Sequence, residues 1–214
     1  MAKKEVVIME RVNNYLIQAA QAKERFLTYD QEKLIGKFGL EYDESYIYVN
    51  LLCKLYRIER TAGHMEFRDG ASWADGNSYD EVMTILDLLC DSREDRRCSG
   101  KLSSMASFGR IFYRSSYDDK PDPTAQWIQD NLESFRNACG QMGKPIPGGD
   151  FGFAFELFDG LQMGLHFWEG DEEFAPRLRF LWDENALQYL RFETMHMATS
   201  LLIKFIKEKM ESQG

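Results

Sequence analysis

The residues best suited to chemistry in this sequence are carboxylates that crowd into a single short segment. Glu169, Asp171, Glu172 and Glu173 stand between two apolar runs, and Asp183 closes the second of these runs. Carboxylates held close together raise one another's pKa or bind a hard cation such as magnesium or calcium, which prefers oxygen ligands. If the flanking runs pair as strands, Asp183 can approach the others. The pattern predicts a cation site with Glu169, Asp171 and Asp183 as ligands.

The same segment has a second interpretation as an ordinary turn. A turn between strands needs polar residues and a glycine, and carboxylates in turns accept hydrogen bonds from nearby backbone amides. The regular oxygen spacing of a calcium-binding loop is absent from 169–173. Both interpretations, a cation site and a capped turn, remain open at the level of sequence.

His166 is the best candidate for a general base among the three histidines. It lies three residues before Glu169 and alternates with Trp168, and an imidazole titrates near neutral pH. No nucleophile motif such as GxSxG accompanies it, so the rest of a catalytic triad is missing. A histidine with a purely structural role is the alternative.

The segments around these residues predict antiparallel strands. The runs 151–158 and 160–168 are separated by Asp159-Gly160, a strong hairpin signal, and Asp150 precedes the first of them. A third strand is predicted over 177–182. Upstream, aromatic and β-branched residues predict strands over 45–51, 54–59 and 64–67, and 69–77 is predicted to be a loop.

Helices are predicted from apolar spacing and from capping residues. The expected ranges are 7–25, 30–39, a helix that begins after the Ser78/Glu81 capping box, 123–142 and 192–209. The polar segment 91–107 is interpreted as an exposed connection. In the first helix one apolar stripe is expected to face the core; it consists of Ile8, Val12, Tyr15, Leu16, Ala19 and Phe26.

Helices and antiparallel strands occur in blocks along the chain, which favours an α+β fold: antiparallel sheet elements packed against several helices. We expect an N-terminal helix over 1–27 and a single compact α+β domain over 28–214.

Composition excludes several partners. The chain has 214 residues and a formal charge of −9, so it lacks the cationic surface with which proteins neutralise nucleic acids or anionic membranes. No export signal or membrane-spanning run is visible, and we expect a cytoplasmic protein. The four cysteines form no CxxC pair and are expected to be reduced thiols. Ten of the acids fall between Asp150 and Glu193.

Several short sequence motifs resemble those of a known family. They are Pro147-Gly148-Gly149-Asp150, then the run from His166 to Phe174 that contains Trp-Glu-Gly-Asp-Glu-Glu-Phe, then Phe180-Leu181-Trp182-Asp183 and Tyr189-Leu190. In this order they resemble the uncharacterised bacterial and archaeal family called domain of unknown function 3786, with Ser99-Gly100-Lys101-Leu102-Ser103 as a looser match. Arg191 and Phe192 replace the family's Pro-Thr, so the hydroxyl N-cap of the last helix is missing.

The resemblance implies a cytoplasmic protein of anaerobic prokaryotes with no established activity. Some relatives are associated with iron-sulfur or corrinoid proteins, but this chain lacks clustered cysteines, and no iron-sulfur cluster is expected. The preferred hypothesis is a non-catalytic soluble binding or accessory module in anaerobic bacterial metabolism, with a small molecule or a protein as partner. The alternative is a metal-dependent hydrolase or lyase that uses a divalent cation at 169–173, with His166, Glu169, Asp171, Glu172 and Asp183 as its catalytic candidates.

Overall fold

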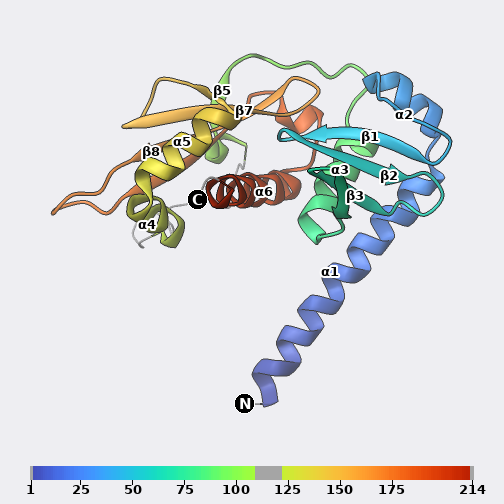
Figure 1. Cartoon of the computed structure of the whole chain (residues 1–214), viewed down its shortest axis with the longest axis horizontal. Coiled ribbons are helices and arrows are strands. Elements are labelled where there is room, and N and C mark those ends of the chain that lie inside the picture. The colour runs from blue at the N-terminus through green and yellow to red at the C-terminus, as the bar shows by residue number, and fades with distance from the viewer. Residues whose placement is uncertain (1, 109–121, 213–214) are drawn as a thin grey trace.

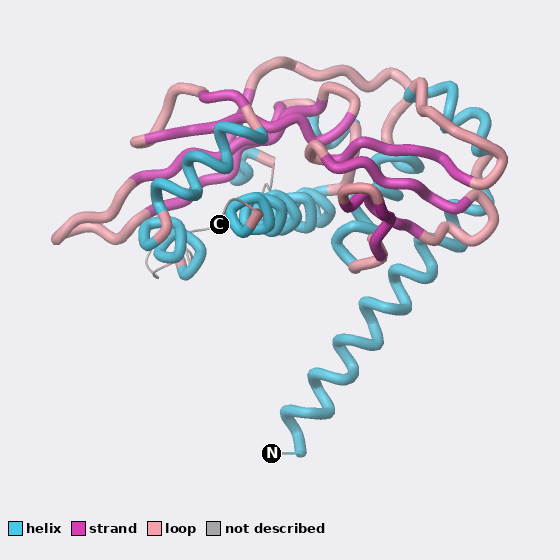
Figure 2. The backbone as a smooth tube through the Cα atoms, in the orientation of Figure 1, coloured by secondary structure: helices cyan, strands magenta, loops and turns pink. Residues whose placement is uncertain are grey.

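Two antiparallel sheets organise the chain (Figures 1 and 2). The computed structural model describes residues 2–108 and 122–212, with side chains from Asn14 onward. The first sheet has the order β1-β2-β3-β4, and its strands are β1 (Tyr46–Leu51), β2 (Lys54–Glu59), β3 (Met65–Asp69) and β4 (Ser72–Asp75). The second has the order β5-β9-β8-β7-β6, and its strands are β5 (Leu102–Ser104), β6 (Lys144–Pro145), β7 (Phe151–Phe158), β8 (Leu161–Trp168) and β9 (Arg177–Asp183).

Six α-helices accompany the sheets in the described part of the chain. They are α1 (Ala2–Thr28), α2 (Gln31–Phe38), α3 (Tyr79–Asp91), α4 (Pro123–Asp130), α5 (Leu132–Met142) and α6 (Phe192–Glu211). Two short 3-10 turns, η1 (Met105–Ser107) and η2 (Ala186–Gln188), complete the elements. The α+β class expected from the sequence is confirmed.

Local sequence signals set several helix ends. The Asp30 side chain accepts a hydrogen bond from the Lys33 amide at the start of α2, and Gly39 ends this helix at φ +60°, a left-handed conformation that glycine adopts without strain. At the start of α3, Ser78 and Glu81 form both hydrogen bonds of a capping box, as the sequence predicts.

The core is built where α6 packs between other elements. α6 contacts α3 along one side and α5 along another, and its Leu202, Phe205 and Ile206 are buried. The two sheets also meet directly, because the amide of Leu52, just after β1, donates to the carbonyl of Leu157 in β7 at 3.1 Å. The helices and both sheets therefore share one hydrophobic core.

Three predictions about the elements were incomplete. The predicted loop 69–77 contains β4, a short edge strand whose sequence Ser-Trp-Ala-Asp does not alternate between polar and apolar residues. Gly70 at φ +57° allows the turn before it. The predicted connection 91–107 contains β5 and η1. The predicted helix 123–142 is two helices, because Asn131 has φ −128° and its side-chain amide donates to the carbonyl of Trp127 at 2.8 Å.

The predicted core stripe of the first helix was correct only at its C-terminal end. Ala19 and Phe26 are buried, but Tyr15 and Leu16 are 48% and 65% exposed. The side chains of Ile8 and Val12 lie outside the described side chains. The reason is geometric: α1 extends away from the body (Figure 1), and α3 is the element that packs along its base.

Candidate functional site

The acidic segment 169–173 is a turn between β8 and β9 in which one carboxylate is engaged with the backbone. Oδ1 of Asp171 accepts hydrogen bonds from the amides of Glu173 and Phe174, both at 2.8 Å. These two hydrogen bonds stabilise the charged carboxylate and lower the pKa of Asp171 below its ordinary value. Glu169, Glu172 and Glu173 are exposed. The arrangement is that of a capped turn.

The Pro147-Gly148-Gly149-Asp150 segment lies against this turn. Oδ2 of Asp150 accepts from the Glu169 amide at 2.7 Å, and the Asp150 amide donates to the carbonyl of Phe167 at 2.8 Å. From the helical side, Oε1 of Gln129 in α4 accepts from the Gly170 amide at 3.0 Å. Asp150 and Asp171 thus hold the two ends of the turn through its backbone.

His166 lies on β8 beneath the same glycine-rich segment. Its ring donates to the carbonyl of Pro147, while Nε2 is buried and has no hydrogen-bond partner. A Cβ added to Gly148 would lie 2.3 Å from the ring, so Gly148 covers the imidazole. Burial, followed by the charge of Arg179 on the neighbouring strand, lowers the pKa of His166. The ring is neutral at pH 7, and its free nitrogen is covered by the backbone.

Asp183 does not join these residues. It ends β9, whereas the turn precedes Arg177 at the start of β9, which places Asp183 about 20 Å further along the strand at roughly 3.3 Å per residue. Its carboxylate is fully buried and accepts from the amides of Ser99, Gly100 and Asn185 at 2.8–3.0 Å. The expected approach of Asp183 to the acidic turn was therefore wrong, and this carboxylate holds the 99–100 loop instead.

No grouping suited to a metal ion occurs in the part of the chain that the structure describes: three or more His, Cys, Asp or Glu side chains do not converge there. All four cysteines are free thiols. Burial raises the pKa of the Cys90 thiol to about 11 and also raises the pKa of Cys98. Both thiols are therefore protonated at neutral pH, the form that neither attacks an electrophile nor binds a metal.

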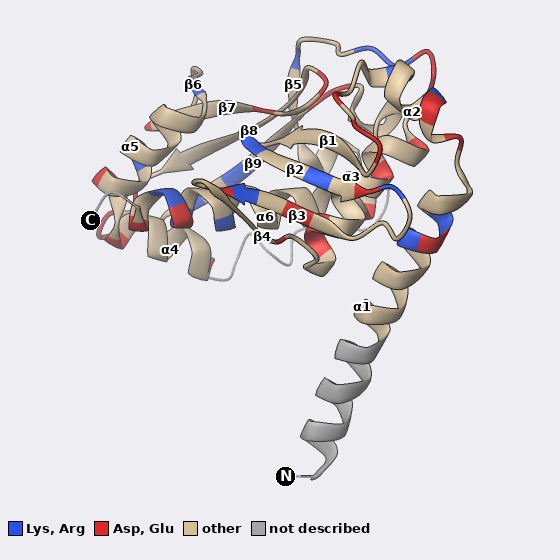
Figure 3. Ribbon diagram, turned by 45° about the vertical axis from the view of Figure 1, so that its right-hand side comes forward, with Lys and Arg blue, Asp and Glu red and all other residues tan. Residues whose placement is uncertain are grey.

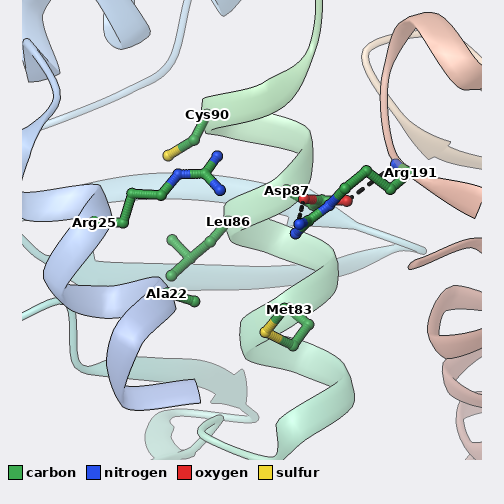
Figure 4. A pocket seen from close by; sticks show the side chains of 7 residues that line it. All are labelled: Ala22, Arg25, Met83, Leu86, Asp87, Cys90 and Arg191. Carbon is green, nitrogen blue, oxygen red and sulfur yellow. Dashed lines mark hydrogen bonds and ion pairs between the residues drawn. The ribbon is translucent and has the colours of Figure 1, made fainter. Parts of the chain in front are cut away.

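A small cavity of about 10 Å³ lies between α1, α3 and the start of α6 (Figure 4). Asp87 and Arg191 form an ion pair at its wall, 2.5 Å between Oδ1 and Nη2. Arg25 and Cys90 also line the cavity. A volume of this size holds at most one water molecule, so the cavity is too small for a metabolite.

A different surface is the exposed side of α1, where the sequence reasoning had assigned Tyr15 and Leu16 to the core and had not considered Ile17 and Leu27. Tyr15, Leu16 and Ile17 are 48%, 65% and 46% exposed, and Leu27 is 39% exposed. The Tyr15 ring contacts the Tyr79 ring of α3 with centroids 4.7 Å apart, whereas Leu16 and Ile17 lie further round the helix. An apolar stripe in addition to the core stripe is the signal by which this surface could have been found.

A comparison with models of protein families shows the family of this chain. The family model described as Domain of unknown function (DUF3786) matches residues 30–205, most of the chain. The protein belongs to the DUF3786 family. The resemblance found in the sequence is thus confirmed. No curated protein and no solved structure matches the chain.

The residues matched by the DUF3786 model include some of the sites described above and exclude the exposed side of α1. The matched range includes the glycine-rich segment, His166, the acidic turn and Asp183, but it begins two residues after α1 ends. The exposed apolar side chains of α1 therefore lie outside the matched range. Among the described helices, α1 included, none has the length and apolar character needed to cross a bilayer.

Proposed function

We propose that this protein is a non-catalytic binding or accessory module and that α1 is the helix it presents to a partner protein. The observation that carries the proposal is an exposed apolar side of α1, a helix that extends from the body (Figure 1). Leu16 (65% exposed), Ala20 and Leu27 (39% exposed) lie there within about 40° of one another, because successive residues of a helix are 100° apart. Contiguous exposed apolar surface on a soluble protein marks an interaction site. A helix with apolar side chains at successive turns fits a groove or another helix.

The polar candidates support this choice over a metal-dependent hydrolase or lyase. Asp171, Asp150 and Asp183 accept hydrogen bonds from backbone amides, and the free nitrogen of His166 is covered by Gly148. A general base must reach the proton that it removes, and a cation needs several oxygen ligands that converge. The geometry around the turn stabilises a loop.

The charge of the chain supports a protein as the partner. A formal charge of −9 opposes binding to nucleic acid or to an anionic membrane, and Figure 3 shows acidic residues distributed over many elements of the body. We also propose that the module acts in the cytoplasm of a prokaryote, as the resemblance found in the sequence implies.

A photo-crosslinking experiment tests this function. The photoreactive amino acid benzoylphenylalanine replaces Leu16 in one variant of the full chain and Asn14 in a matched variant; Asn14 is also exposed on α1 but lies on another side of the helix. Both proteins are irradiated in extract of the native cells. A protein adduct formed at position 16, absent at position 14 and lost when Ile17→Glu is added supports the proposal. Equal labelling at both positions, or no adduct at position 16, contradicts it.

A further inference from the structure

One edge of the His166 ring is closed off by two glycines. The ring donates a hydrogen bond to the carbonyl of Pro147, while Nε2 is buried and has no hydrogen-bond partner. The donating nitrogen is therefore Nδ1, and Nε2 of the neutral ring carries only a lone pair. A Cβ built on Gly148 would lie 2.5 Å from Nε2 and 2.3 Å from Cε1. Gly148 thus covers the edge of the ring that contains Nε2 and Cε1.

A proton on Nε2 finds no acceptor while the ring is covered. The charged imidazole is a donor at both nitrogens, and a buried charged donor without a partner is unfavourable. Arg179 of β9 stands opposite His166 in the register, and its positive charge opposes a second one. On the other side β7 places Gly152 opposite the ring, and the covering residues have no titratable side chain. The nearby carboxylate of Asp150 accepts from the Glu169 amide instead.

The covering glycines can move while the sheet stays intact. The amides of Ile146 and Asp150, on either side of them, donate to carbonyls of β7 and β8 at 2.9 and 2.8 Å. Between these two anchors, the amides of Gly148 and Gly149 donate to no backbone carbonyl of the described residues. Both glycines are exposed and have positive φ angles of +127° and +68°. Glycine adopts φ of either sign at little cost, so this pair has other backbone paths open to it.

We propose that Gly148-Gly149 is a pH-sensitive strap, which covers the His166 ring while the ring is neutral and lifts from it when Nε2 takes a proton from the solvent. Lifting lets water reach Nε2, and water supplies the acceptor that the covered ring lacks. The Pro147 carbonyl accepts from Nδ1 in both states, so the movement is confined to the two glycines. Because the charged ring is favoured only in the open form, protonation shifts the population toward that form.

The direction of the switch follows from the surroundings of the ring. Burial is the main cause that lowers the pKa of His166 below its ordinary 6.5, and Arg179 acts in the same direction. The strap is therefore closed at neutral pH and opens on acidification. It lies within the residues matched by the family model, and it is independent of the function proposed for α1. Acid uncovers an imidazolium edge beside the acidic turn.

Solution NMR of the full chain tests the proposal. A soluble gadolinium chelate speeds the relaxation of the protons that it can approach, and the nitrogen chemical shifts of the ring report its protonation. The Cε1 proton of His166 lies under Gly148, whereas Cδ2 faces Gly152, whose added Cβ would lie 2.6 Å away. We expect the relaxation rate of the Cε1 proton to rise severalfold with the same midpoint as the nitrogen shifts. The rate of the Cδ2 proton should stay unchanged.

A variant and a second histidine serve as controls. Asp150→Asn removes the carboxylate next to the strap and should preserve the rise at Cε1 of His166. His64, whose side chain is 50% exposed, should relax equally fast at both ends of the titration. Four results overturn the proposal: a constant rate at Cε1 while the ring titrates, an equal rise at Cδ2, a rise abolished by Asp150→Asn, or a ring that stays neutral until circular dichroism shows unfolding.

Discussion

The buried carboxylate of Asp87 on α3 accepts a hydrogen bond from the backbone amide of Arg191 at the start of α6, at 3.1 Å. The hydroxyl of Thr194 donates to the same oxygen at 2.5 Å, and the Arg191 guanidinium pairs with the other oxygen. Arg191 has no side chain able to cap its own helix. A residue more than a hundred positions earlier therefore anchors the start of α6, where Arg191 makes no side-chain cap.

Replacing Asp87 should destabilise the fold. In Asp87→Ala the Arg191 amide, the Thr194 hydroxyl and the guanidinium lose one shared partner, and a buried hydroxyl left without its hydrogen-bond partner costs about 1–3 kcal/mol. Urea unfolding should show this as a lower midpoint. Glu193→Gln, an exposed change in the first turn of α6, should alter stability by less than about 1 kcal/mol. Equal effects of the two substitutions would contradict the anchoring role of Asp87.

Two glycine-to-alanine substitutions should change stability in opposite directions. In Gly148→Ala the new Cβ would lie 2.3 Å from the His166 ring at a φ of +127°, so the segment over the imidazole must shift and the free energy of unfolding should fall. In Gly36→Ala the Cβ meets nothing within 4 Å inside α2, and alanine favours a helix by about 1 kcal/mol. Thermal unfolding of both variants measures the signs; a stabilised Gly148→Ala variant is incompatible with the described contact.

His166 should make stability depend on pH. Burial lowers its pKa in the folded chain below the ordinary 6.5, so between the two values the unfolded chain binds more protons. The contribution of the neutral His166 ring to the free energy of unfolding is complete above about pH 6.5. It is lost as the pH falls toward the pKa of His166 in the folded chain. His196 is shifted in the same direction, so the comparison needed is between wild type and His166→Gln. Urea unfolding at both ends of this window should show a smaller loss for the variant; equal losses would refute the assignment.

The acidic turn shows how far the sequence could lead. The strands on each side, and the hairpin at Asp159-Gly160, follow from local alternation and turn residues, and both are confirmed. Whether Asp171 faces a cation or a backbone amide is decided by the path of two later residues, which composition does not encode. The position of the Asp183 carboxylate depends on the pairing of β9 with β8. The position of the Asp87 carboxylate depends on the packing of α3 against α6. These long-range relationships are set by tertiary packing and have no local sequence signal.

The exposed stripe of α1 was missed for a related reason. Leu16 and Ala19 are three residues apart, so spacing alone places them on one stripe. Only the path of the helix past the end of the body separates buried Ala19 from exposed Leu16. Where a helix leaves its domain is a property of the assembled elements, so the predicted core stripe contains both buried and exposed residues.

Asp171 should act as a turn cap that responds little to cations. Asp171→Ala removes the acceptor of the Glu173 and Phe174 amides, and these amides should exchange their hydrogens with solvent faster. Addition of magnesium or calcium should leave the melting temperature of the wild type unchanged, because a ligand raises stability only if the native state binds it. Glu172→Ala, an exposed neighbour, is the control for exchange. A melting temperature raised by either cation and restored by Asp171→Ala would instead support the metal-dependent enzyme.

Asp183 should stabilise the loop that precedes β5. Its fully buried carboxylate accepts from the amides of Ser99, Gly100 and Asn185, and hydrogen bonds to a charged group contribute more than neutral ones. Asp183→Ala leaves these amides without their acceptor and should lower the free energy of unfolding by roughly 3 kcal/mol. Hydrogen exchange should accelerate at Ser99 and Gly100 but not at Glu173, on the far turn. Glu184→Gln, an exposed neighbour, should preserve the slow exchange of these amides. Faster exchange at Ser99, Gly100 and also Glu173 in Asp183→Ala would mean that Asp183 supports the whole sheet rather than this loop.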